Sequence, residues 1–268
     1  MTRPGKLLIP LGLGFAFLYL PLLLMAVFSF NDSRMVTSFT GFSTRWYAAL
    51  WNNAPLMEAL FLSLRIAAVS ATMATVLGMA AGFALARWRR FPGRAGFAAV
   101  MAAPLVVPEV ITGLSLLLLF VAMEAFLGVP GRGAGTVAVA HATFGAAYVA
   151  VVVQARLAEF DLSLEEAAAD LGARPPTVFR TITLPLIAPA VGAGWLLAFT
   201  LSLDDLVVAS FVSGPGATTL PMAVFSAVRL GLTPEFYALA TVLVLAVGIA
   251  VALAMWTAGR GGGRKSPP

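Results

Sequence analysis

The 268-residue sequence has no cysteine and only one histidine, His141. A disulfide framework and a thiolate metal site are therefore excluded, and one histidine cannot build a histidine metal cluster. Charge is scarce too: 11% of residues are Asp, Glu, Lys or Arg, against roughly 25% in ordinary soluble domains. There is no nucleotide-binding loop either, because Arg264 in the tail GRGGGRKSPP stands where such a loop needs its second glycine. We expect no metal, no cofactor and no catalytic centre.

Apolar residues are abundant instead, at 60% of the chain, and several runs reach the roughly 20 residues that cross a bilayer. This predicts an all-α, polytopic membrane protein with one transmembrane domain over 1–268. The first run follows Arg3 and Lys6 but is too long for a signal peptide and lacks a small-residue cleavage site, so we expect an uncleaved spanning helix. Six segments are predicted to span: about 7–30, 60–86, 98–123, 134–154, 186–212 and 235–257.

The 17 basic residues predict the orientation. If both termini are cytoplasmic, twelve lie at inner segments and four, Arg34, Arg45, Arg132 and Arg229, lie in outer loops, while Arg65 is near the start of the second span. Positive charge concentrates on the cytoplasmic side of membrane proteins. The high isoelectric point therefore reflects topology, and no nucleic-acid partner is expected. The inner residues are Arg3, Lys6, Arg87, Arg89, Arg90, Arg94, Arg156, Arg174, Arg180, Arg260, Arg264 and Lys265.

A charged segment, EEAAADLGARPPTVFRTITLPL, lies in the predicted cytoplasmic loop 155–185. Ser163 and Glu166 have the spacing of a capping box, which predicts the start of a helix over about 164–171. Gly172 and the prolines at 175–176 predict its end, and a second short segment, 177–184, is expected to stop at Pro185. Such a short helix is not stable alone. It either lies on the bilayer or docks into a partner, although a capped connecting loop is the simpler alternative.

The spacing within this segment resembles a known motif. Glu166-Ala167-Ala168, three residues, Gly172, nine residues, Ile182 and Leu184-Pro185 resemble the EAA motif of bacterial ABC-importer permeases. Further stretches, among them FLYLPLLLMAVFSFN, APLVVPEVITGLSLLLLF and WLLAFTLSLDDLVVASFVSGPGATTLPM, resemble the spermidine/putrescine branch of that family, and within it the second permease of putrescine importers.

The resemblance implies a type I ABC-importer permease fold with six spans in a bacterial inner membrane, surrounded by lipid. It also implies a homologous sister permease as heterodimer partner, two cytosolic ATPase subunits that hydrolyse ATP, and a periplasmic or extracellular polyamine-binding protein. The charged loop would then be the coupling helix that sits in a groove of the ATPase. The coupling residues implied are Glu165, Glu166, Ala167, Ala168, Asp170, Leu171, Gly172 and Ala173.

Three carboxylates fall inside predicted spans: Glu109, Asp204 and Asp205. An aspartate at a bilayer centre costs roughly 2.5–3.5 kcal/mol on translocon scales, so such residues face the bundle interior or a watery cavity. We expect these three to line the path of a cationic polyamine. The alternatives are that Glu109, after Pro108, caps a broken helix and that the aspartates pair with an arginine of the partner permease. His141 is expected to be a hydrogen-bonded packing residue.

Other functions compete with the importer. A proton-coupled secondary transporter would use the same carboxylates as a relay and would need no ATPase. An intramembrane aspartyl protease needs aspartates from different helices, whereas Asp204 and Asp205 are neighbours, and a non-transporting scaffold would not need the coupling motif. We therefore predict a permease subunit, not an enzyme, for a polyamine such as putrescine. Composition and motifs do not decide between putrescine, spermidine and another small cation.

Overall fold

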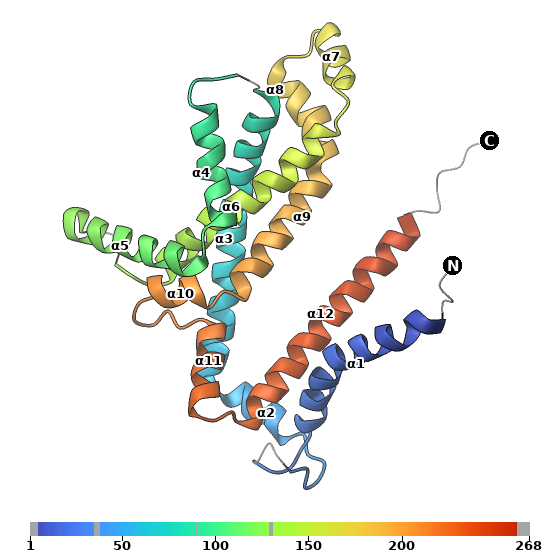
Figure 1. Ribbon diagram of the computed structural model, residues 1–268, viewed down its shortest axis with the longest axis vertical. Coiled ribbons are helices and arrows are strands. Elements are labelled where there is room, and N and C mark those ends of the chain that lie inside the picture. The colour runs from blue at the N-terminus through green and yellow to red at the C-terminus, as the bar shows by residue number, and fades with distance from the viewer. Residues whose placement is uncertain (1–4, 35–37, 89, 129–130, 262–268) are drawn as a thin grey trace. The chain divides into compact units, whose positions relative to one another are not determined.

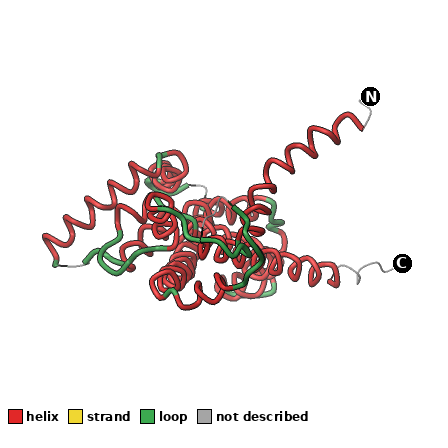
Figure 2. Tube along the Cα trace, turned by 90° about the horizontal axis from the view of Figure 1, so that it is seen from below, coloured by secondary structure: helices red, strands yellow, loops and turns green. Residues whose placement is uncertain are grey.

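The computed structural model describes residues 5–34, 38–88, 90–128 and 131–261. The predicted all-α class is confirmed: apart from one isolated bridge between Asn31 and Phe42, the regular structure of these residues is helical (Figures 1 and 2). Arg3, Arg89, Arg264 and Lys265, used above for orientation, lie outside the described residues. The elements are α1 Gly5–Phe28, α2 Arg45–Asn52, α3 Ala54–Arg87, α4 Arg94–Val106, α5 Glu109–Leu127, α6 Ala134–Ala158, α7 Ser163–Asp170, α8 Pro175–Val178, the π-helix η1 Phe179–Thr183, α9 Leu184–Leu203, α10 Val207–Val212, α11 Leu220–Leu230 and α12 Pro234–Gly261.

Within the described residues, six helical segments are long and apolar enough to cross a membrane, which confirms the predicted number. Their bounds differ from the predicted ones chiefly in the third and fifth segments. The six are Leu8–Phe28, Ala54–Arg87, Glu109–Leu127, Ala134–Ala158, Pro175–Leu203 and Pro234–Leu253.

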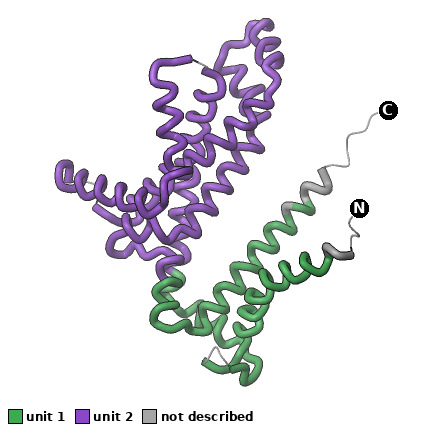
Figure 3. Tube along the Cα trace, in the orientation of Figure 1, with its two compact units in different colours: residues 1–57, 224–268 green, residues 58–223 purple. Residues whose placement is uncertain are grey.

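The chain divides into two compact units, shown in two colours in Figure 3. One comprises residues 1–57 and 224–268, where α12 packs against α1 and α2 and the Asn53 side-chain amide donates to Glu235 at 3.0 Å. The other comprises residues 58–223 and holds both regions described below. We expected a single domain, and composition does not mark this division because both units consist of apolar helices.

Small residues let α3 and α6 approach closely within the second unit. A Cβ atom at Gly78 would lie 2.5 Å from the Ala146 carbonyl oxygen, and one at Gly82 would lie 2.7 Å from that of Ala150. Membrane helices associate largely through such close packing, because lipid tails offer no hydrophobic drive between helices. The glycines therefore set the distance between these two spans.

Gly78→Val is expected to lower the thermal midpoint of the detergent-solubilised protein by about 2–12 °C, because overpacking of this kind costs about 1–3 kcal/mol. Gly192→Val is the matched control, since a Cβ atom at Gly192 in α9 meets nothing within 4 Å. Equal midpoints for the two variants would contradict the close approach of α3 and α6.

Two predicted spans are broken. The expected helix 98–123 is divided between α4 and α5, because Val107 is extended (φ −74°, ψ 132°) before Pro108, as residues that precede proline commonly are. The expected helix 186–212 is divided between α9 and α10 at residues 204–206. Since α10 packs against α5, the two breaks lie close together and create the candidate site.

Candidate functional site

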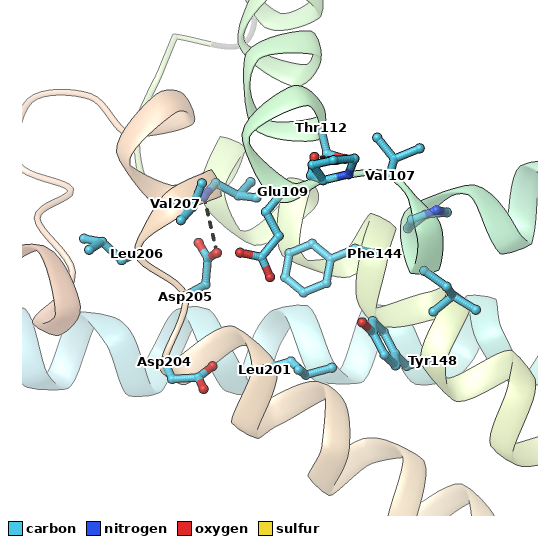
Figure 4. Close-up of a pocket in the computed structure, with 14 residues that line it drawn as sticks. Val107, Glu109, Thr112, Phe144, Tyr148, Leu201, Asp204, Asp205, Leu206 and Val207 are labelled. Atoms are coloured by element: carbon cyan, nitrogen blue, oxygen red, sulfur yellow. Dashed lines mark hydrogen bonds between the residues drawn. The ribbon is translucent and has the colours of Figure 1, made fainter.

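A pocket of about 440 Å³ lies between the two helix breaks (Figure 4). It is lined by all three carboxylates predicted from the sequence: Glu109 at the start of α5, and Asp204 and Asp205 between α9 and α10. Figure 4 shows the Glu109 and Asp205 carboxyl groups pointing into the same space beside the Phe144 ring. The volume of the pocket falls within the roughly 300–1,000 Å³ that is typical of sites for small molecules.

Helix α6 contributes two aromatic walls, Phe144 and Tyr148. Sequence reasoning missed both as site residues. A usable signal was present, because His141, Phe144 and Tyr148 follow each other at intervals of three and four residues and so share one face of a helix. The aromatic faces carry partial negative charge, which attracts cations.

The pocket is electronegative. Within the described residues its lining includes no Lys or Arg, and none of the ion pairs found there involves Asp204 or Glu109. Both of these residues are exposed in the isolated chain. Two carboxylates without an ion pair among the described residues, beside aromatic faces, are chemically suited to attract a positively charged group.

Asp205 differs from its neighbour because its carboxylate is bound on several sides. It accepts from the backbone N–H groups of Val208 at 3.3 Å and Ala209 at 2.7 Å, and it lies 3.1 Å from His141 Nε2. Leu206 occupies the N-cap position of α10, and Asp205, one residue earlier, caps the helix with its side chain by accepting from two first-turn N–H groups. Asp205 therefore lines the pocket and is also held in place by hydrogen bonds at the break, whereas the Asp204 side chain lines the pocket and is exposed.

The charged loop contains the predicted short helix, α7, over Ser163–Asp170 instead of 164–171. The expected capping box of Ser163 and Glu166 is wrong, because no side chain caps α7 in this way. The Ser163 backbone N–H donates to Asp161 at 3.0 Å, and this bond, followed by one from the Ser163 hydroxyl, lowers the pKa of the Asp161 carboxyl. The contact is present at neutral pH and is lost as pH falls through that lowered pKa.

Gly172 ends the helix as predicted, in the left-handed conformation (φ 83°). The Ala173 N–H donates to the Ala168 carbonyl at 3.0 Å and the Gly172 N–H to that of Ala169 at 2.9 Å, which is the Schellman pattern. The expected stop at Pro185 is wrong: α8, η1 and α9 are continuous from Pro175 to Leu203. A π-helical turn, η1, precedes the proline. In such a turn the backbone hydrogen bonds join residues five apart instead of four, as the Leu184 N–H does with the Phe179 carbonyl.

The two glutamates of the loop face different ways. Glu165 is held inside the chain by Arg87 of α3 at 2.7 Å and by the Thr183 hydroxyl of η1 at 2.5 Å, while the Arg87 guanidinium also covers the Phe160 ring at 4.9 Å. The sequence did not indicate this clamp of Arg87, Glu165 and Thr183, because its members are far apart along the chain. The Glu166 side of α7 is open instead: Glu166, Ala167 and Asp170 are exposed, and Leu171 is 90% exposed.

Comparison with known proteins identifies the family to which this fold belongs. Residues 74–258 match the family model described as "Binding-protein-dependent transport system inner membrane component". The chain belongs to this family. It is 58% identical over 250 residues to the putrescine transport system permease protein PotI of Escherichia coli K12, covering 93% of this chain and 89% of that protein. It is 42% identical over 231 residues to the spermidine/putrescine transport system permease protein PotC of the same organism, covering 86% and 85%.

Solved structures agree on the fold of this inner membrane component. The chain resembles one in a bacterial ABC transporter for the acidic polysaccharide alginate, with a TM-score of 0.68 and 14% identity over 98% of this chain and 99% of that one. It also resembles one in the MetNI methionine ABC transporter, with a TM-score of 0.61 and 18% identity over 77% and 95%. The type I ABC-importer permease fold implied by the EAA motif is thereby confirmed, and the protein is a multi-pass membrane permease.

Proposed function

We propose that this permease carries a polyamine, putrescine in the first place, through the pocket lined by Glu109, Asp204 and Asp205. The observation that supports this most directly is the pocket's charge: carboxylates line it without a basic residue among the described lining. The similarity to PotI and PotC supports the same substrate class.

The chemistry of the lining suits a diamine. A protonated amine seeks a carboxylate partner, and Asp204 and Glu109 are both without an ion pair among the described residues. The methylene chain between two ammonium groups needs apolar contacts, which Leu201, Val207 and Phe144 supply. Tyr148 adds a ring face to which an ammonium group is attracted by about 0.5–2 kcal/mol.

Energy is supplied by two ATPase subunits that dock on α7. The surface available for docking is the exposed side with Glu166, Ala167, Asp170 and Leu171, where alanines permit close approach. Ala168 and Ala173 are half-buried, and Gly172 forms the turn that ends the helix. In this proposal both termini and the loop are cytoplasmic, and closure of the ATPase dimer moves α7 and switches the permease between inward- and outward-facing states.

A sister permease and a polyamine-binding protein complete the proposed importer. In the isolated chain Asp204 and Glu109 are exposed, and so are large apolar side chains beside them, including Val106 and Val110. A homologous permease placed over this side would close the pocket and keep water from the route.

The experiment is uptake of radiolabelled putrescine into proteoliposomes that contain this chain, its candidate sister permease and ATPase, together with the binding protein, with and without ATP. We expect uptake that requires both ATP and the binding protein. Uptake without ATP would instead support the proton-coupled secondary transporter. ATP hydrolysis stimulated by the binding protein with a different solute would retain the importer and reject putrescine.

A further inference from the structure

Behind the pocket, four buried polar side chains from separate parts of the fold form one hydrogen-bonded row. Ser70 of α3 donates to Ser202 of α9 at 2.9 Å, and Ser202 Oγ lies 2.6 Å from His141 Nδ1. His141 Nε2 lies 3.1 Å from Asp205 Oδ2. His141 is 2% exposed and does not line the pocket itself.

One arrangement of hydrogens satisfies the whole row. With the proton on Nε2, His141 donates to Asp205 and accepts from Ser202 at Nδ1, while the Ser202 oxygen accepts from Ser70. The Asp205 carboxylate then receives three donors: the imidazole and the backbone N–H groups of Val208 and Ala209. A buried carboxylate satisfied in this way is held in one orientation, because leaving a buried polar group unpaired is costly.

We propose that His141 is a positioning residue for the substrate pocket. By fixing Asp205 as the cap of α10, it fixes the break at residues 204–206 and so holds the Asp204 carboxyl towards the pocket. Two observations support this. Asp204 is the C-cap of α9 and its backbone N–H still donates to Thr200, so its placement depends on where α9 stops. His141 joins the end of α9 to the cap of α10 through its two nitrogens.

The test uses the absence of natural cysteine in this chain. In the assembled transporter, Asp204→Cys provides the chain's one thiol, and its rate of modification by a charged thiosulfonate reagent is measured on this chain by mass spectrometry. His141→Gln places an amide near Nε2 and retains the bond to Asp205, whereas His141→Asn places one near Nδ1 and retains only the bond to Ser202. We expect the modification rate to change about tenfold with His141→Asn and to stay near the parent rate with His141→Gln.

The control is Val137→Ala, also on α6 and fully buried, in the core beside α10 but outside the polar row. An unchanged rate in the His141→Asn variant, or the same change in the Asn, Gln and Val137→Ala variants, would overturn the positioning role. The accompanying transport effect rests on the proposed function. In chains with native Asp204, His141→Asn is expected to raise KM for putrescine about tenfold with a smaller change in maximal rate. A changed modification rate together with unchanged KM would retain the positioning role and reject the pocket as the putrescine route.

Discussion

Asp204→Asn is expected to raise KM for putrescine by about 10- to 100-fold while the amount of folded, assembled permease stays near normal. A hydrogen bond to a charged group contributes about 1.5–3 kcal/mol, and each 1.4 kcal/mol is a factor of ten. Asp204 is exposed at the pocket, so its removal leaves no buried partner without a bond. Uptake kinetics in proteoliposomes, at matched protein content, measure the effect.

Two further variants separate substrate binding from the architecture of the site. Glu124→Gln removes a carboxylate from α5 that does not line the pocket, and it is expected to leave KM unchanged. Asp205→Asn removes the charge and leaves one acceptor oxygen for the three donors of His141, Val208 and Ala209, so it is expected to reduce folded yield before it alters KM. Identical kinetics for Asp204→Asn and Glu124→Gln would show that the pocket is not the cation route.

Glu166→Lys is expected to reduce ATP-driven uptake by about 100-fold or more. ATP hydrolysis is expected to continue without substrate and binding protein. Like charges brought together at an interface cost several kcal/mol, and Glu166 lies on the exposed side of α7 proposed to meet the ATPase. Membrane insertion is expected to be normal, because α7 is outside the six apolar segments. Parallel assays of uptake and ATP hydrolysis measure the uncoupling.

Glu159→Lys is the matched control for this charge reversal. The Glu159 side chain is 76% exposed at the end of α6, outside α7, so the same change of charge is made near the loop without touching the docking helix. Loss of uptake in both variants would assign the effect to the loop's overall charge. Coupled uptake in the Glu166→Lys variant would contradict docking through this side of α7.

The parts of the molecule that depend on local sequence could be predicted. Hydropathy alone predicted six spans, and the glycine and prolines after α7 predicted its end. The break at Pro108 was considered only as an alternative for Glu109, because membrane helices tolerate proline. The break at residues 204–206 could not be placed, because the surrounding residues remain apolar. Asp205 was expected to line the cation path together with Asp204. The sequence does not show which of two adjacent aspartates accepts from the N–H groups of α10.

The features of the site that the sequence did not predict depend on contacts between residues far apart along the chain. Glu165 and Glu166 have the same side chain, and only the positions of Arg87 and Thr183 distinguish the half-buried, ion-paired glutamate from the exposed one. His141 was expected to be a hydrogen-bonded packing residue, and it is buried and hydrogen-bonded. Its connection to the pocket requires Ser202 and Asp205, which lie more than 60 residues further along the chain.

The clamp at Arg87 has a mechanical consequence, because α3 also carries Ser70. Arg87 attaches this helix to α7 and η1, and Ser70 attaches it to the end of α9 beside the pocket. The two attachments are 17 residues apart on an uninterrupted helix, a length of about 25 Å. A continuous helix resists stretching along its axis, so the loop and the pocket wall are kept at a constant separation on that side. In the proposed transport cycle, the pocket therefore opens by rotation or tilt of the whole helix.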